Sequence, residues 1–97
     1  MKIVKYPAIN LKNLLNQRAH GISFEEASTV FYDKNARLIP DPKHSDEEDR
    51  FIMLGFSSNA HLLIVCHCYR QNDEVIRIIS ARKAEKDESK QYNRFKG

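Results

Sequence analysis

Residues 61–82 read HLLIVCHCYRQNDEVIRIISAR, and this stretch predicts the centre of the fold. Residues 61–70 are apolar on both alternating faces, which is typical of a strand in the middle of a sheet. A short polar turn follows, and residues 74–81 are again rich in isoleucine and valine. We therefore expect a hairpin in which the second strand returns antiparallel to the first.

The register of this hairpin decides which side chains share a face, and the sequence leaves two registers open. A three-residue turn places His67 opposite Arg77, so that an imidazole lies beside a guanidinium. A two-residue turn pairs Arg70 with Val75 and places Arg77 opposite Cys68, so that the two arginines share one face. Either register gives a cationic face. Placing a charged arginine among isoleucine and valine costs free energy unless a group of opposite charge binds it. The hairpin therefore suggests a site for a polyanion such as RNA.

Two helices are expected before the hairpin. In the first, one arginine lies on the same side as three leucines at helical spacing: Leu11, Leu14, Leu15 and Arg18. The second begins at Ser23, a good N-cap, and Glu26 lies three residues later, which is the pattern of a capping box. These two helices are expected to cover one face of the sheet.

The order of elements predicts the fold class. We expect a strand, two helices, four strands and a last helix, at residues 2–6, 10–19, 23–33, 36–40, 50–57, 61–70, 74–81 and 83–95. Helices gathered at the front and consecutive antiparallel strands behind them are typical of an α+β domain. The prediction is a single domain of residues 1–97, with two N-terminal helices packed on an antiparallel sheet of about four to five strands, and a C-terminal helix.

Composition excludes several classes of protein. No run is apolar for long enough to span a membrane, and the first residues lack the pattern of a signal peptide, so we expect a cytoplasmic protein without membrane contact. Cys66 and Cys68 are two apart in a strand, a poor geometry for a disulfide, and His67 between them faces the other way. We predict reduced thiols and no metal or other cofactor.

Charge is distributed unevenly along the chain. The net charge is +3; residues 77–97 hold seven Lys or Arg against three acids, whereas residues 41–50 hold five acids against two bases. A basic end beside an acidic loop favours an anionic ligand, although a solvated surface with a mild skew is the plainer interpretation.

RNA cleavage by attack of the 2′-hydroxyl needs a base, an acid and cations for the charge that builds on phosphorus. Guanidinium groups can bind two phosphate oxygens at once, and histidine titrates near neutrality. The catalytic candidates are Arg77 and Arg82 as phosphate clamps, His67 or Arg70 at the scissile group, and Glu48 or His20 for proton transfer.

Further residues are candidates for binding RNA. Lys83, Lys86, Lys90 and Arg94 recur every three or four residues on the last helix, and Tyr92 could stack on a base.

Each of these residues also has a structural interpretation. Arg77 would pair with an acid, and His67 would be a hydrogen-bonded core residue. His20 would only interact favourably with the dipole at the C-terminal end of a helix. The lysine stripe would then be a solvated face.

The chain resembles the BrnT family of type II toxin–antitoxin toxins over about four-fifths of its length. The matching segments are residues 20–27 (HGISFEEA), 30–33 (VFYD), 39–42 (IPDP), 44–45 (HS), 48–51 (EDRF), 54–58 (LGFSS), 67–70 (HCYR) and 77–84 (RIISARKA), with Glu88 and Tyr92. Lys12 and Asn16 also match, and Lys12 is added to the RNA-binding candidates. The aromatic-acidic-tryptophan-aspartate run that commonly begins the family is replaced by Tyr6-Pro7-Ala8-Ile9, and Ala19 stands where a lysine is usual.

The resemblance implies a RelE-like fold and a metal-independent endoribonuclease that inhibits translation and growth. It also implies a cognate antitoxin similar to BrnA, with a ribbon-helix-helix domain, so that DNA is contacted only through the antitoxin. The oligomeric state stays open between a dimer and a heterotetramer with the antitoxin. Because the N-terminal pattern is changed, the alternative is a non-catalytic toxin homologue that binds antitoxin or RNA.

Overall fold

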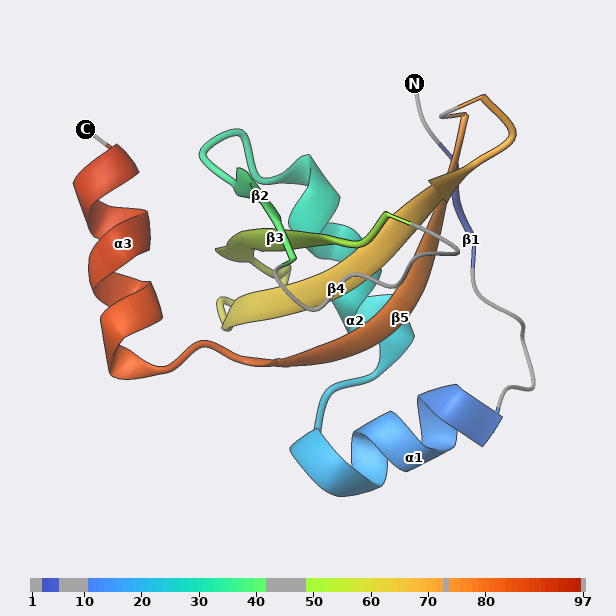
Figure 1. Cartoon of the computed structure of the whole chain (residues 1–97). Helices are drawn as coiled ribbons and strands as arrows, with labels where there is room; N and C mark the ends of the chain where they lie inside the picture. The colour runs from blue at the N-terminus through green and yellow to red at the C-terminus, as the bar shows by residue number, and fades with distance from the viewer. Residues whose placement is uncertain (1–2, 6–10, 42–48, 73, 97) are drawn as a thin grey trace.

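The computed structural model describes residues 3–5, 11–41, 49–72 and 74–96. Its elements, shown in Figure 1, are β1 (Ile3–Lys5), α1 (Leu11–His20), α2 (Phe24–Ser28) continued by a 3-10 turn (Thr29–Tyr32), β2 (Arg37–Pro40), β3 (Phe51–Phe56), β4 (Leu62–Arg70), β5 (Val75–Lys83) and α3 (Lys86–Lys96). This order is the one that the sequence predicted, and the bounds agree within three residues. The α+β class with a C-terminal helix is confirmed.

The sheet has five strands in the order β1-β5-β4-β3-β2. Strands β2 to β5 form a consecutive antiparallel series, and β4 is the middle strand, as its two apolar faces predicted. β1 departs from the expectation of a wholly antiparallel sheet, because it pairs with β5 in parallel. A helical segment follows β1 rather than a tight turn, so no hairpin forces the strand into an antiparallel pairing.

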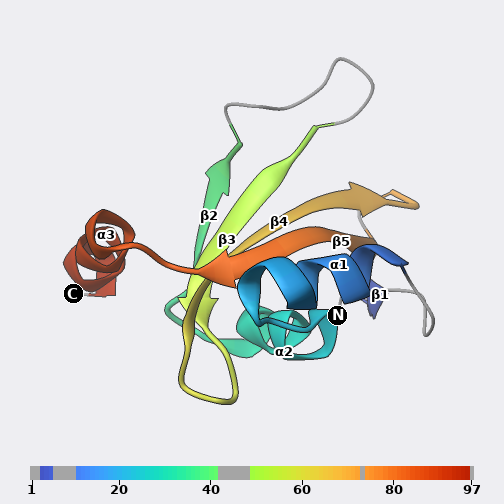
Figure 2. The same ribbon diagram turned by 90° about the horizontal axis from the view of Figure 1, so that it is seen from below.

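Helix α2 covers one face of the sheet. Ser23 is its N-cap, as predicted, and the Ser23 hydroxyl accepts a hydrogen bond from the backbone N–H of Glu26 at 3.0 Å. Phe24 and Ala27 point inward and are completely buried with Leu63 of β4. In Figure 2, α1 and α2 lie on the same side of the sheet. We call this side the covered face.

Helix α1 presents its polar side chains to the protein. Asn13 and Asn16 are its buried residues, whereas Leu11, Leu14 and Leu15 are exposed. An amphipathic helix normally packs on its leucines. The leucine spacing therefore indicated the helix correctly but does not mark its packing face.

The amide of Asn16 fixes this unusual orientation. Its NH₂ group donates to the carbonyl oxygens of Ile22 and Ala81, both at 2.8 Å, and its oxygen accepts from the N–H of Ala81 at 3.0 Å. The amide thus replaces a neighbouring strand at the outer edge of β5, beyond the short pairing with β1.

Helix α3 lies beyond the β2–β3 side of the sheet (Figure 1) and is held mainly by Tyr92. The Tyr92 ring is 2% exposed and packs with Leu54 and Ile64, and its hydroxyl donates to Oδ2 of Asp33 at 2.7 Å. Among the residues that the structure describes, no helix has the length and apolar character needed to cross a membrane.

Candidate functional site

A β-bulge in β5 decides where the arginines of the hairpin point. Ile78 pairs with His67, and Ser80 pairs with Cys66, although His67 and Cys66 are adjacent in β4. Ile79 is therefore one extra residue in β5 with no partner of its own. A bulge of this kind reverses the side to which all later residues of the strand point.

The bulge brings Arg77 and Arg82 to one face. They are five positions apart in the sequence, and in a regular strand an odd spacing places side chains on opposite faces. Arg77 pairs with Cys68 and Arg82 pairs with Ile64, and these two partners are four residues apart on β4. The two arginines therefore share a face and lie about 13 Å apart along the strand.

Arg70 belongs to the same face. It pairs with Val75, and Cys68 pairs with Arg77, so the structure has the register of the two-residue turn. Arg70 and Arg77 are thus diagonal neighbours, with Cα atoms about 7–8 Å apart by the usual geometry of such pairs. Both side chains are exposed.

This side of the sheet is the one that α2 does not cover, and we call it the open face. Only part of it is exposed, because Tyr92 of α3 packs on it at Leu54 and Ile64. Arg37 of β2 also belongs to it, since its partner Leu54 packs with Ile64 and Tyr92 rather than with α2. Arg50 lies close enough to Cys66 to act on the pKa of its thiol. Five of the chain's seven arginines therefore lie on the open face (Arg37, Arg50, Arg70, Arg77 and Arg82). Arg37 and Arg50 were not predicted as site residues, because the face on which each lies depends on how β2 and β3 pair.

The two predicted phosphate clamps differ in their contacts. Nη1 and Nη2 of Arg82 each donate to a carboxylate oxygen of Glu88 in α3, both at 2.8 Å. This hydrogen-bonded pair raises the pKa of Arg82 and lowers the pKa of Glu88. Arg77 is exposed and makes no hydrogen bond or ion pair with any residue that the structure describes, Glu74 included. Arg77 is thus the more accessible of the two guanidinium groups, and Arg82 also anchors α3.

His67 is enclosed in the core of the covered face. Its side chain is 0% exposed and meets the ring of Phe31 edge-on, with centroids 4.9 Å apart. Nδ1 donates to the carbonyl oxygen of Val65 at 3.0 Å, so Nε2 is left to accept from the hydroxyl of Tyr69 at 3.2 Å. Burial lowers the pKa of His67 despite the bond to Val65. The structure thus places His67 inside the covered face, on the other side of the sheet from Arg70 and Arg77, and does not bring it to them. Its role at the scissile group stays a prediction.

The other proton-transfer candidates are not brought to the arginines. His20 ends α1, which lies on the covered side of the sheet (Figure 2), and Lys12 lies in the first turn of the same helix. Glu48 falls outside the described residues.

The residues predicted to bind RNA near the C-terminus are also dispersed. Tyr92 is buried and cannot stack on a base in this structure, because it fastens α3 to the sheet. Lys83 ends β5 opposite Leu63, and so belongs to the covered face rather than to the last helix. Lys86 and Lys90 are exposed on the side of α3 that lies opposite Tyr92 by helical spacing. The expected continuous basic track from Arg82 is therefore not formed.

Cys66 lies on the open face, but its thiol is unreactive. Its thiol donates to Oδ2 of Asp41 at 3.3 Å, and burial together with this carboxylate raises the pKa of Cys66 to about 12. A thiol with this pKa supplies almost no thiolate at neutral pH, so Cys66 does not suit nucleophilic catalysis. No three His, Cys, Asp or Glu side chains gather as metal ligands within the described part of the chain.

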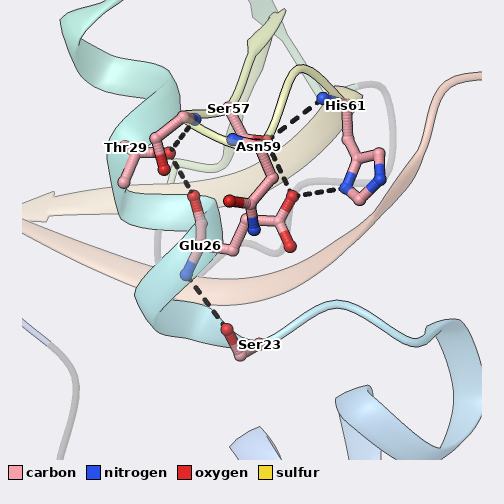
Figure 3. A network of polar contacts seen from close by, with 7 residues as sticks. Ser23, Glu26, Thr29, Ser57, Asn59 and His61 are labelled. Carbon is pink, nitrogen blue, oxygen red and sulfur yellow. Dashed lines mark hydrogen bonds and ion pairs between the residues drawn. The ribbon is translucent and has the colours of Figure 1, made fainter.

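A second polar cluster ties the β3–β4 turn to α2 (Figure 3). The Oε2 atom of Glu26 accepts from the hydroxyl of Ser57 and meets Nδ1 of His61, both at 2.7 Å. Burial works to raise the pKa of Glu26, but hydrogen bonds from Ser57, His61 and Asn59 outweigh it and lower the pKa. The Glu26 carboxylate therefore binds this turn instead of closing the predicted capping box, and no sequence pattern indicated its contact with His61.

Comparison with known proteins adds a family to this geometry. Residues 10–88 match the family model described as a ribonuclease toxin, BrnT, of a type II toxin–antitoxin system. A search of curated proteins finds no match to this chain. The matched range holds α1, α2, β2 to β5 and the start of α3, including every arginine of the open face, and a toxin of this type has a cognate antitoxin as its partner. The chain belongs to the BrnT family of ribonuclease toxins, as its sequence motifs indicated.

Proposed function

We propose that this protein is a metal-independent endoribonuclease toxin that cuts RNA on the open face of its sheet and so inhibits translation and growth. The observation that carries the proposal is the bulge at Ile79, which aligns Arg77 and Arg82 on one face beside Arg70. Membership in a ribonuclease family and the exposed guanidinium groups of Arg70 and Arg77 on one face fit the same chemistry. The helices and the antiparallel strand series also suit the RelE-like fold that we propose for the family.

The reaction would need little from the protein beyond position and charge. The 2′-oxygen of one nucleotide attacks the adjacent phosphorus, a 2′-O–P bond forms, and the bond from phosphorus to the 5′-oxygen breaks. A base takes the 2′-hydroxyl proton, and the leaving oxygen receives one, so a 2′,3′-cyclic phosphate and a 5′-hydroxyl result. Arg77 and Arg70 would hold the negative charge that increases on the phosphate oxygens. Glu48 or His20 stays the predicted residue for proton transfer.

The cognate antitoxin is proposed to carry a ribbon-helix-helix domain, to neutralise the toxin and to mediate any contact with DNA. The membership of the chain in a toxin–antitoxin family supports this partner.

The test uses purified protein, end-labelled RNA and excess EDTA. We expect cleavage in the chelator, and Arg77→Ala should slow it by about 100-fold, the typical cost of losing one donor to a developing oxyanion. Lys34→Ala is the matched control, because Lys34 is an exposed cation in the turn before β2. This variant should cleave RNA at the native rate. Cleavage that requires a divalent metal, or full activity in Arg77→Ala, would contradict the proposal.

A second candidate function is a toxin homologue that binds but does not cut. The burial of His67 favours it, since this removes one histidine from the reacting groups. The same assay separates the two candidates, because a binding module would retain RNA in a salt-sensitive complex and release no products.

A further inference from the structure

The outer face of α1 is an exposed apolar surface. Leu11, Leu14 and Leu15 are 69%, 56% and 52% exposed, and with Gln17 and Arg18 they line a hollow of about 530 Å³. We call these five residues the leucine ridge. Single exposed leucines are ordinary on proteins, whereas three on one helix face form a patch that usually marks an interaction site.

The leucine ridge is a fixed feature of the fold, because α1 cannot roll to bury it without breaking bonds elsewhere. Asn16 makes three hydrogen bonds, to Ile22 and to both backbone polar groups of Ala81. Asn13 accepts from the N–H of Phe24 at 2.9 Å and donates to Glu25 at 3.1 Å. Rolling the helix inward would leave these buried groups without partners.

Charge indicates the chemistry of the occupant. Helix α1 carries Lys12, Arg18 and His20 and no carboxylate. A second copy of this chain would bring the same cations against themselves, which an interface disfavours. RNA would suit the cations but not the leucines. An amphipathic protein segment with apolar side chains and a carboxylate opposite Arg18 fits both features.

We propose that the leucine ridge is the docking site for an apolar, acidic segment of the cognate antitoxin. This inference rests on the antitoxin partner of the family and not on the proposed RNA-cleaving site. Helix α1, which carries the ridge, lies on the covered side of the sheet (Figure 2), so antitoxin bound here would leave the arginines of the open face uncovered by this contact. Docking and blocking of the RNA site would then be separable.

The experiment compares variants of the full chain in binding to its cognate antitoxin by calorimetry. The triple variant Leu11→Gln, Leu14→Gln, Leu15→Gln should bind on the order of 100-fold more weakly, since buried apolar anchors dominate such interfaces. Leu38→Gln is the matched control, because Leu38 is a leucine of β2 that is 50% exposed, and its affinity should stay within about threefold of the native value. Arg18→Glu should weaken binding more than Arg18→Lys.

Other outcomes would overturn the proposal. Unchanged antitoxin affinity in the triple variant would do so, as would an equal loss in Leu38→Gln. If light scattering shows that the native chain alone is a dimer and the triple variant a monomer, a second copy occupies the ridge instead. Circular dichroism checks folding, and the single variant Leu14→Gln, expected to bind more weakly than native, repeats the test if the triple variant is destabilised.

RNA cleavage in EDTA is measured separately from antitoxin binding, so that failure of this proposal and failure of the proposed function can be distinguished. The triple variant should cleave RNA as the native chain does. If the native chain cleaves nothing, the proposed function fails while the binding comparison still decides the role of the ridge.

Discussion

The two faces of the sheet use the same strands for different purposes. On the covered face, Leu63 and Val65 of β4 pack with α2 and are completely buried. On the open face, alternate positions of the same hairpin carry Arg70 and Arg77, and both are exposed. Ile64 and Cys68 on the open face are buried too, so the contrast between the faces lies in the exposed guanidinium groups, which a ligand can reach. The comparison predicts that stability and RNA cleavage respond to different substitutions.

The largest effect on stability is expected on the covered face. Phe24→Ala would leave a cavity beneath α2, because the Phe24 side chain is 0% exposed. The free energy of unfolding should fall by about 3–5 kcal/mol, as in comparable large-to-small core substitutions. Urea denaturation followed by circular dichroism measures it. Tyr32→Ala, which removes an exposed aromatic residue, is the control, and an equal loss in both variants would break the distinction between buried and open surface.

The second effect concerns the edge of β5, where polar groups and not apolar ones hold α1. Asn16→Ala would leave both polar groups of Ala81 and the carbonyl of Ile22 without their side-chain partner. We expect a loss of about 2–3 kcal/mol in the free energy of unfolding. Gln17→Ala on the exposed side of the same helix should cost less than about 0.5 kcal/mol. A neutral Asn16→Ala would show that α1 is held by other contacts.

A smaller effect is expected at the β3–β4 turn. Glu26→Gln removes the charge that Ser57 and His61 stabilise, and should cost about 1–2 kcal/mol at pH 7. The pKa of Glu26 is lowered in the folded state, so this contribution is complete above about pH 4.5 and is lost as the pH falls through the folded value. Native and variant proteins should therefore converge in stability in acid. Thermal unfolding between pH 3 and 7 tests this, with Glu74→Gln as an exposed control; a difference in stability that does not decrease as the pH falls below about 4.5 contradicts it.

Periodicity and capping made most of the fold predictable from the sequence. The two apolar faces of residues 61–70 identified the central strand, and Ser23 identified the start of α2 within one residue. These features are local, so a single sequence carries them.

Three other features depend on contacts between distant residues. The bulge at Ile79 arises from the pairing of β4 with β5, and no local pattern marks it. The orientation of α1 depends on Asn16 meeting Ala81, 65 residues away, against the signal of the leucines. The burial of His67 was uncertain for the same reason, because the ring of Phe31 that packs against it comes from a distant part of the sequence. The sequence could therefore predict that the arginines of the hairpin make a cationic face, but not which residues from other elements lie beside them.

The most direct test of the account maps RNA onto the two faces by NMR. A 2′-O-methyl RNA oligonucleotide, which lacks the attacking hydroxyl and cannot be cut, would be titrated into ¹⁵N-labelled protein. The account predicts amide shift changes at Arg70, Arg77 and Arg82 on the open face, and little change in α2. Shift changes confined to α1 and α2, or an absence of binding at low salt, would contradict the assignment of the open face to RNA.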